Sequence, residues 1–314
     1  MHSFRAACVV ATLALLGCSE DAPVDGTTTT GEPEPTPCSD EEPCPMPEDQ
    51  VCLVGQCHDG IAPVLEIVSP EQEQSADWTP GGDTTDLEVT VRVRGFQIVD
   101  PEIDPTNVRA AGHVILELDG TEVAMIIEGD AAAGVTVRVP AIAAAGPHRL
   151  AAHLRLSDGT PYDHPEAAVR RFFWFADGAP RVGVVSPWPG DEFTTGAQPL
   201  DVTAATVDFE LVPAAADKAP GAVGVVHVFF DAEFPSCGES PACADAYNGV
   251  VAPTGPASSA LGSVTLPADD ASATSILTVH LAHTDHEPYC QPDLIGCLPV
   301  WDSVELPRIV PGGM

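Results

Sequence analysis

Residues 87–94 have the sequence Leu-Glu-Val-Thr-Val-Arg-Val-Arg, in which every second side chain is apolar and those between are polar or charged. Because successive side chains of a β-strand point to opposite faces, this alternation predicts a strand with one face in a core and the other in water. Residues 135–139, Val-Thr-Val-Arg-Val, alternate in the same way. No window carries a helical stripe of useful length, so the sequence predicts domains built from strands.

An internal repeat organises most of the chain. Residues 62–70 (APVLEIVSP) are echoed by residues 179–187 (APRVGVVSP), residues 112–119 (GHVILELD) by residues 224–231 (GVVHVFFD), and residues 153–158 (HLRLSD) by residues 280–285 (HLAHTD). Three matched stretches in the same order and at similar separations indicate a duplicated domain. We place copy one at residues 61–178 and copy two at residues 179–314.

Each copy is expected to contain six or seven short strands separated by Pro, Gly and Asp, which favours an antiparallel β-sandwich. The expected strands lie near residues 64–68, 86–95, 113–119, 122–127, 134–139, 148–157 and 169–175 in copy one, and near residues 182–185, 200–211, 224–231, 262–266, 274–283 and 300–306 in copy two. The opening Ala-Pro…Ser-Pro strand and the strand running from Gly to Asp resemble those of bacterial immunoglobulin-like and fibronectin type III-like domains. The resemblance implies an all-β fold with two tandem immunoglobulin-like sandwiches. Neither copy has the Cys-Trp-Cys core of antibody domains, and a fold of this kind implies no particular function.

The N-terminus predicts export. A short positive start precedes an apolar segment, Ala6–Leu16, that is too short for a membrane-spanning helix and is typical of a signal peptide. Residues 15–18, Leu-Leu-Gly-Cys, close this segment and resemble the lipobox of bacterial lipoproteins. The resemblance implies removal of residues 1–17, a diacylglycerol and a further acyl chain on Cys18 and, with Ser19 next, attachment to the outer membrane. The alternative is an ordinary cleavage site at which Cys18 is only a small apolar residue.

Two short segments precede the sandwiches. Residues 18–37 are rich in Thr, Glu, Pro, Gly and Asp, and predict an extended, disordered tether. Residues 38–60 hold four cysteines between prolines and glycines, which is too little material for a hydrophobic core, and predict a disulfide-rich module. The spacing resembles short Cys-rich modules, loosely of Dickkopf N-terminal or EGF type, in surface lipoproteins of myxobacteria and their relatives.

Cysteine usage agrees with an oxidising compartment. Of ten cysteines, Cys8 leaves with the signal peptide and Cys18 takes the lipid, so eight remain and predict four disulfides. The expected pairs are Cys38 with Cys52 and Cys44 with Cys57 in the module, and Cys237 with Cys243 and Cys290 with Cys297 in loops inserted into copy two. Four cysteines allow three connectivities, so other pairings stay open in the module. A zinc knuckle formed by the module cysteines with His58 is a further alternative there.

The charge balance limits the partners of the chain. It carries 47 acidic and 12 basic side chains, for a formal net charge of -35. Nucleic acid and anionic lipid headgroups both require a basic face, so we exclude them as partners. Divalent cations and basic surfaces remain compatible with this charge.

No constellation of residues predicts catalysis. The sequence has no Gly-x-Ser-x-Gly elbow, no Walker loop, no dinucleotide fingerprint and no His-Glu-x-x-His pattern. Carboxylates are plentiful, but none is singled out as a glycosidase-like pair. We therefore predict that the protein is not an enzyme.

The histidines of copy two form the candidate metal site. His280, His283 and His286 follow at three-residue spacing, and His227 lies on an expected strand of the same copy. A turn after the strand of His280 would bring His283 and His286 back toward His227 or His280, which gives imidazole ligands suited to zinc or copper. The alternative is a set of solvated histidines, because copy one has His153 at the position of His280 with no further histidine nearby.

Two acidic clusters offer oxygen ligands for calcium. They are Asp100, Glu102 and Asp104 in copy one and Asp269 with Asp270 in copy two. Neither cluster has the spacing of an EF-hand loop.

We predict a non-catalytic, lipid-anchored protein of the cell envelope that serves adhesion, binding of a protein or glycan, or spacing. The alternative function is metal binding by the copy-two histidines, and a third class, an exported hydrolase, lacks a nucleophile. Trp188, Tyr247 and Tyr289 lie in expected loops of copy two and are a candidate aromatic patch for a partner. Trp174 and Trp301, on the last strand of each copy, are expected in the core.

Overall fold

The computed structural model describes residues 50–53, 56–59, 63–78, 85–103, 111–142, 144–162, 164–214, 221–231, 247–268, 273–292 and 297–310. Residues 36–314 form one compact unit. The expected signal peptide, the lipid site at Cys18, the tether, Cys38 and Cys44 lie outside the described residues. Within the described ranges, no helix has the length and apolar character needed to span a membrane.

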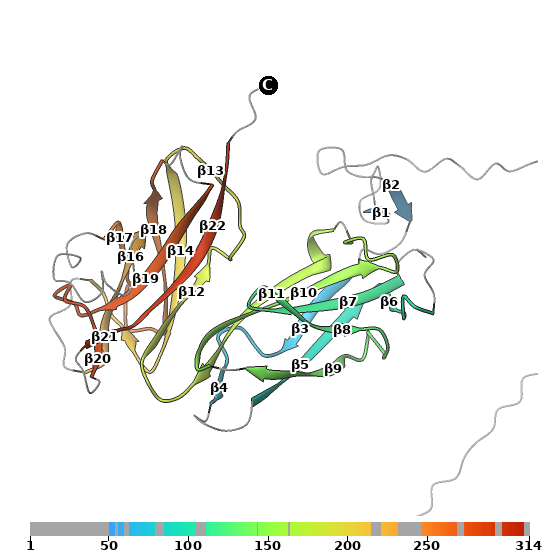
Figure 1. The fold of residues 1–314 in the computed structure, drawn as a ribbon, viewed down its shortest axis with the longest axis horizontal. Helices are drawn as coiled ribbons and strands as arrows, with labels where there is room; N and C mark the ends of the chain where they lie inside the picture. The colour runs from blue at the N-terminus through green and yellow to red at the C-terminus, as the bar shows by residue number, and fades with distance from the viewer. Residues whose placement is uncertain are drawn as a thin grey trace, which may run out of the picture. The chain divides into compact units, whose positions relative to one another are not determined.

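Copy one is a sandwich of two β-sheets (Figure 1). Three strands make one sheet in the order β3-β5-β9, and six make the other in the order β4-β11-β10-β7-β6, with β8 also paired to β7. The strands are β3 (Val64–Ser69), β4 (Ser75–Asp77), β5 (Thr85–Arg94), β6 (Gln97–Ile98), β7 (Ala111–Leu118), β8 (Thr121–Ile126), β9 (Val135–Ile142), β10 (Gly146–Leu156) and β11 (Ala168–Ala176). A short 3-10 helix, η1 (Pro165–Ala167), precedes β11.

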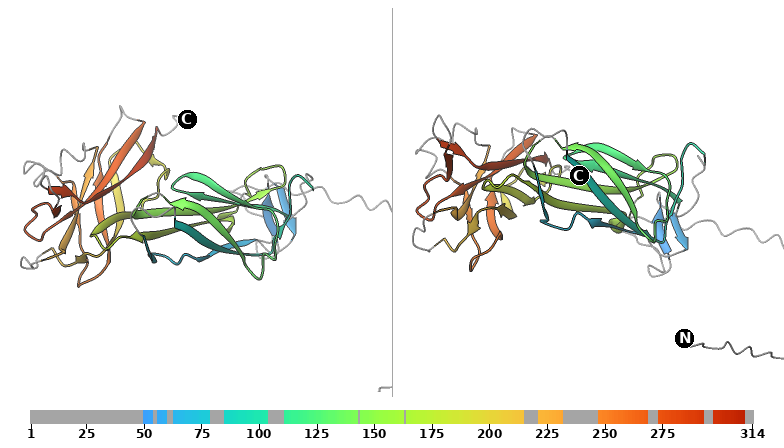
Figure 2. Two further views of the ribbon diagram at one scale, coloured as in Figure 1. Left: turned by 60° about the horizontal axis from the view of Figure 1, so that its bottom comes forward. Right: turned by 90° about the horizontal axis from the view of Figure 1, so that it is seen from below.

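Copy two repeats this strand order. Its three-stranded sheet has the order β12-β14-β18, and its six-stranded sheet has the order β13-β22-β19-β16-β15, with β17 also paired to β16. The strands are β12 (Arg181–Ser186), β13 (Phe193–Thr194), β14 (Gln198–Val207), β15 (Glu210–Leu211), β16 (Val223–Phe230), β17 (Gly249–Val251), β18 (Ser259–Leu266), β19 (Thr274–Ala282) and β22 (Trp301–Ile309). The shared order is the arrangement that a duplicated domain requires, and Figure 2 shows the two layers of each sandwich from two further directions.

The all-β immunoglobulin-like fold is therefore as expected, with one difference in the pairing. The long strands are antiparallel to their neighbours, whereas the short edge strands β4, β6, β13 and β15 each pair in parallel with the strand beside them. These edge strands have two or three residues each and carry little sequence pattern. Consequently β4, β6 and β13 were absent from the expected strands, and β15 fell at the end of the strand expected at residues 200–211.

The glycines that open the echoed segment are required by close backbone approach. A Cβ atom at Gly112 would overlap the backbone carbonyl of Arg155, and a Cβ atom at Gly224 would overlap that of Ala282. Because these neighbours are backbone atoms, they cannot move aside as a flexible side chain would. Both copies thus keep a glycine for the same contact between their central strands.

The aspartates that close the echoed segment fasten the same two strands. Asp119 and Asp231 have φ values of 51° and 54°, in the left-handed region that aspartate tolerates better than most residues. The Asp119 N–H donates to the carbonyl of Arg149 over 2.8 Å, and its Oδ1 accepts the Arg149 N–H over 2.8 Å. Asp231 makes the same two bonds to Ile276, over 2.9 and 2.7 Å. The echoed Gly…Asp segment is therefore a structural motif.

The core of each sandwich lies between its two sheets. In copy one, Leu87, Val89, Val91 and Val93 of β5 are buried while Glu88 is exposed, which confirms the alternation seen in the sequence. The core of copy two is mainly aliphatic, and its buried members include Val184, Val202, Leu211, Val228, Leu266, Leu277, Val304 and Leu306.

Two hairpins contain cysteines. In the first, β1 (Gln50–Leu53) pairs with β2 (Gln56–Asp59) and sets Cys52 directly opposite Cys57. In the second, β20 (Cys290–Pro292) pairs with β21 (Cys297–Pro299), with Cys290 opposite Pro299. The Cys237 loop lies outside the described residues. Cys290 is disulfide-bonded, and the four expected pairings remain predictions.

Two expectations about copy two are wrong. Trp301 is 39% exposed, because odd-numbered residues of β22 face away from the core that Val304 and Leu306 enter. The strand expected at residues 200–211 ends at Val207, because Asp208 takes a left-handed conformation with φ 55°. Trp174 is buried as expected, although it packs beside Phe172 and outside the sandwich core.

Candidate functional site

The histidines of copy two come together in part. His227 on β16 lies directly opposite His280 on β19, and His286 follows in the loop after β19. His227 Nε2 lies 2.9 Å from His286 Nδ1, so one imidazole donates a hydrogen bond to the other. Tyr247 stacks on the His227 ring with the ring centres 4.1 Å apart. His283 lies elsewhere, with its ring 5.3 Å from that of Tyr289.

Burial sets the charge of these rings. His227 is 1% exposed, and burial, followed by repulsion from His286 and His280, lowers its pKa to about 3. Burial lowers the pKa of His280 to about 4. Both imidazoles are therefore neutral at pH 7, the form in which histidine binds a metal or accepts a hydrogen bond.

The four predicted metal ligands do not converge on one point within the described residues. There, no group of three or more His, Cys, Asp or Glu side chains is placed to hold a metal ion. The expected turn does occur, because β19 ends at Ala282 and His286 has a φ of 67°. The zinc or copper site remains a prediction, and of its four expected ligands His227 and His286 lie within hydrogen-bonding distance of each other.

The calcium clusters are only partly described. Asp100 Oδ1 accepts the backbone N–H of Glu102 over 2.9 Å, which is a local turn contact. Asp104, Asp269 and Asp270 lie outside the described residues.

The three loop aromatics each pack against a different neighbour. Tyr247 covers His227, Tyr289 contacts Phe209 with the ring centres 4.9 Å apart, and Trp188 lies under the guanidinium of Arg170. Tyr289 packs against the core of copy two, so it is not part of a shared aromatic surface.

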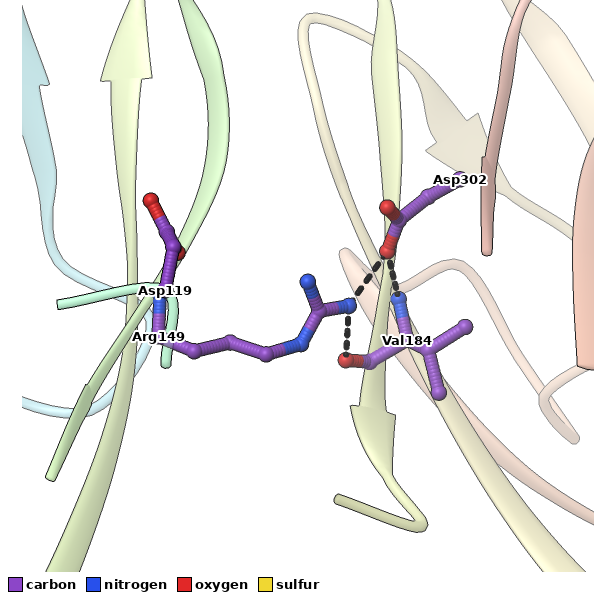
Figure 3. A network of polar contacts seen from close by, with 4 residues as sticks. All are labelled: Asp119, Arg149, Val184 and Asp302. Atoms are coloured by element: carbon purple, nitrogen blue, oxygen red, sulfur yellow. Dashed lines mark hydrogen bonds and ion pairs between the residues drawn. The ribbon is translucent and has the colours of Figure 1, made fainter. Parts of the chain in front are cut away.

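A polar network that the sequence did not reveal joins the two copies (Figure 3). Arg149 of β10 extends from copy one, and its Nη2 donates to Asp302 Oδ2 of β22 and to the carbonyl of Val184 in β12, the latter over 3.0 Å. The Val184 N–H donates to the same Asp302 oxygen over 2.8 Å. The side chains of Arg149 and Asp302 are only 10% and 13% exposed.

Opposing effects act on the pKa of the Asp302 carboxyl. Burial raises the pKa of its carboxyl, while the Arg149 guanidinium and the Val184 N–H favour the ionised form. In a buried ion pair each charge has its partner in place of water, so the two groups stabilise each other only in a defined geometry.

Apolar contacts surround this network. Phe172 and Trp174 of β11 pack in one buried cluster with Ala205 of β14. A Cβ atom at Gly183 would lie 2.5 Å from the Phe172 ring and 2.7 Å from Pro147, so this glycine permits the close approach of the two copies.

A cavity of about 330 Å³ lies beside this contact. Its lining includes Glu117, Asp119, Ala151, His153 and Arg170 of copy one, with Trp188 of copy two. Carboxylates, a guanidinium, an imidazole and an indole meet there.

No known family model matches the sequence, and no match is found among curated proteins. Among solved structures, the fibronectin(III)-like modules of CbhA from Clostridium thermocellum share 16% identity, with a TM-score of 0.25, and the match covers 78% of this chain and 94% of that chain. A mutant of Salmonella alpha-2-macroglobulin shares 8% identity with a TM-score of 0.23, over 80% of this chain and 15% of that chain. Dpr2 Ig1-Ig2, solved in complex with DIP-Theta Ig1-Ig3, shares 8% identity with a TM-score of 0.23, over 79% of this chain and 100% of that chain. Scores this low carry no argument, so the description as two immunoglobulin-like sandwiches rests on the strand order.

Proposed function

We propose that the chain is a non-catalytic lipoprotein of the cell envelope whose two sandwiches act as one stiff unit for binding, adhesion or spacing. The observation that carries this proposal is the Arg149–Asp302 ion pair, which is buried between the copies and shared with the backbone of Val184. Domains joined only by a linker are expected to move relative to each other. A buried charge pair opposes that motion, because separating the copies would break its hydrogen bonds.

Stiffness can be measured by placing a spin-labelled unnatural amino acid at Glu88 in copy one and at Asp201 in copy two, since both positions are exposed. Pulsed electron resonance should give a narrow distance distribution for the full chain. The same labels with Asp302→Ala should give a broader one. Equal widths in the two proteins would contradict the proposal.

The lipid anchor is supported by the lipobox residues 15–18 and is tested separately. Cells expressing the chain and fed an alkyne-bearing palmitate should label it, and the protein should fractionate with outer membranes. Cys18→Ser should remove both the label and the fractionation. Labelling that survives this substitution would reject Cys18 as the acylated residue.

Metal binding is a second candidate, favoured by the 2.9 Å approach of His227 Nε2 and His286 Nδ1. Zinc takes four ligands, and these two imidazoles would be part of that set. Zn²⁺ or Cu²⁺ should then raise the free energy of unfolding of the full chain, and with it the unfolding midpoint, relative to EDTA. The expected gain in free energy is about 2.7 kcal/mol when the metal is present at a hundred times its Kd. His227→Gln with His286→Gln should abolish the rise, and no rise with either metal would exclude this function.

A further inference from the structure

Strands β7, β10 and β11 form the floor of the cavity beside the contact between the copies. On β10, Leu150, Ala152 and Leu154 enter the core, so Arg149, Ala151 and His153 face outward. Ala151 lies directly between Glu117 on β7 and Arg170 on β11. A small residue between two long ones leaves a hollow with a carboxylate on one side and a guanidinium on the other.

Two turns close the hollow. The turn at Asp119 and Gly120 forms one edge, and Trp188 and Pro189 of copy two form a wall. Trp188 is held in place, because its backbone N–H donates to Asp191 Oδ2 over 2.8 Å and Arg170 lies 5.5 Å from its ring centre. Arg170 in turn donates to Asp191 Oδ1 over 2.6 Å. The wall from copy two is therefore fixed to the floor from copy one.

The polar groups of the cavity retain hydrogen-bonding capacity. Glu117 Oε2 lies 3.7 Å from His153 Nε2, which is too long for a hydrogen bond. The Glu117 and Asp119 side chains are 32% and 45% exposed. Asp119 already accepts the Arg149 N–H at Oδ1 and lies 2.7 Å from His148 Nδ1 at Oδ2, so about two of the four acceptor positions of its carboxylate remain. Arg170 keeps donors beyond the one given to Asp191, and its side chain is 47% exposed. Burial lowers the pKa of His153, so its neutral ring both donates and accepts.

This arrangement favours a ligand with alternating donors and acceptors and no strong net charge. The carboxylates of Glu117 and Asp119 would repel an anion, and a simple cation could not accept hydrogen bonds from Arg170. A pyranose ring offers hydroxyls that donate to the carboxylates and accept from the guanidinium, and C–H groups that pack on Trp188 and Pro147. The volume of about 330 Å³ is at the lower end of ligand pockets, which suits one ring better than an extended chain.

We propose that this cavity binds a single pyranose unit of a glycan, with Glu117 and Asp119 as acceptors, Arg170 as donor and Trp188 as the apolar wall. The proposal rests on the proposed binding function and names its ligand class. Because floor and wall come from different copies, the site is complete only while the copies are held together.

The test is a titration of the full chain with D-glucose, D-galactose, D-mannose, N-acetyl-D-glucosamine and D-glucosamine, each up to about 10 mM, followed by saturation-transfer NMR and tryptophan fluorescence. We expect saturable binding of at least one pyranose. Ala151→Leu, which fills the hollow, and Glu117→Gln, which keeps the shape of the side chain, should each weaken it at least tenfold. Glu88→Gln, on an exposed strand position of the same sandwich, should leave it unchanged.

Several outcomes would overturn the assignment. These are no binding of any sugar in the panel, binding that Ala151→Leu and Glu117→Gln leave intact, and binding of choline chloride in place of all the sugars. Circular dichroism shows whether Ala151→Leu still folds, and Glu117→Gln keeps the test valid if it does not. Spin-label distances and lipidation do not depend on the sugar, so failure here is distinguishable from failure of the proposed function.

Discussion

Removing the carboxylate of Asp302 should be among the most damaging changes in the described part of the chain. Asp302→Ala leaves the Arg149 guanidinium and the Val184 N–H without their shared acceptor in a site where the two side chains are 10% and 13% exposed. Breaking a buried pair by removing one partner typically costs about 3–5 kcal/mol. The residual exposure lets some water reach Arg149, so we expect about 3 kcal/mol, at the lower end of that range.

Urea unfolding followed by circular dichroism and tryptophan fluorescence measures this loss of stability. It also shows whether the two sandwiches unfold together. In the wild-type chain the sandwiches should unfold together, whereas in Asp302→Ala the two probes should separate into two transitions. Glu66→Ala is the matched control, because it removes an exposed ion pair with Arg92 inside copy one that is worth at most about 1 kcal/mol.

A double-mutant cycle decides whether the charge pair is responsible. Arg149→Met with Asp302→Ala removes both charges, and it should be more stable than Asp302→Ala alone because no buried charge is left unpaired. The coupling energy should be at least about 1.5 kcal/mol, as for other close charge pairs. If Asp302→Ala costs less than about 1 kcal/mol, or the two changes simply add, the structural role assigned to this network is refuted.

The remaining predictions concern packing and pH. Gly183→Ala should cost about 1–3 kcal/mol by urea unfolding and broaden the spin-label distances, because its Cβ would meet Phe172 and Pro147 of copy one, whereas Gly196→Ala, with open space around it, should have neither effect. Gly224→Ala should cost at least about 3 kcal/mol, because the backbone of Ala282 cannot yield, and a nearly neutral result would contradict the close approach of β16 and β19. The pKa values of His227 and His280 fall from 6.5 to about 3 and about 4 on folding, so the unfolded chain binds more protons below pH 6.5 and the protein should lose stability as the pH falls through that value. Each histidine contributes about 1.4 kcal/mol per pH unit, and His227→Phe should reduce the slope of stability against pH measured between pH 7 and about 5, while an unchanged slope would reject the burial of His227 as its cause.

The parts of the fold that follow from local pattern were accessible to the sequence. Alternation located β5 and β9, and the echo of Gly112…Asp119 in Gly224…Asp231 marked the strands that carry the closest backbone contacts. The Arg149–Asp302 pair was not accessible, because its members are 153 positions apart and neither stands in a recognisable motif. Arg149 is one of two arginines in β10, the other being Arg155, and nothing in the local sequence identifies its partner.

The approach of His286 to His227 could be predicted from the sequence in part. The turn after β19 followed from Thr, Asp and Pro in the sequence, and it does bring His286 to His227. The sequence could not separate His283 from His286, because which imidazole reaches the strand depends on the left-handed conformation of His286, with a φ of 67°. The prediction for Trp301 was wrong for a related reason, because the face of the sheet on which a strand residue lies depends on where the strand begins.

The outer faces of the two six-stranded sheets are covered in different ways. The backbone bonds of Asp119 to Arg149 and of Asp231 to Ile276 show that Arg149 and Ile276 occupy equivalent positions on the outer face of the six-stranded sheet. In copy one this face receives the next sandwich, and Arg149 is buried there by Asp302.

In copy two, no later sandwich covers that face within the described residues, and Ile276 is 40% exposed. Further along the same face, His227 is covered by Tyr247, which follows the loop that copy two has gained after β16, and by His286, which lies in a turn equivalent to the turn at Gly159 in copy one. Side chains of copy two, Tyr247 and His286, thus cover part of a surface that copy one covers by contact with its neighbour. Polar rings under a loop cover permit a charge change on protonation that aliphatic packing would not, so acid should loosen the loops of copy two at a pH where the core of copy one is still intact. Amide hydrogen exchange at pH 7 and about pH 5 would measure this, with faster exchange expected in the loop of His286 than in β5 and β9, and equal changes in both regions would argue against it.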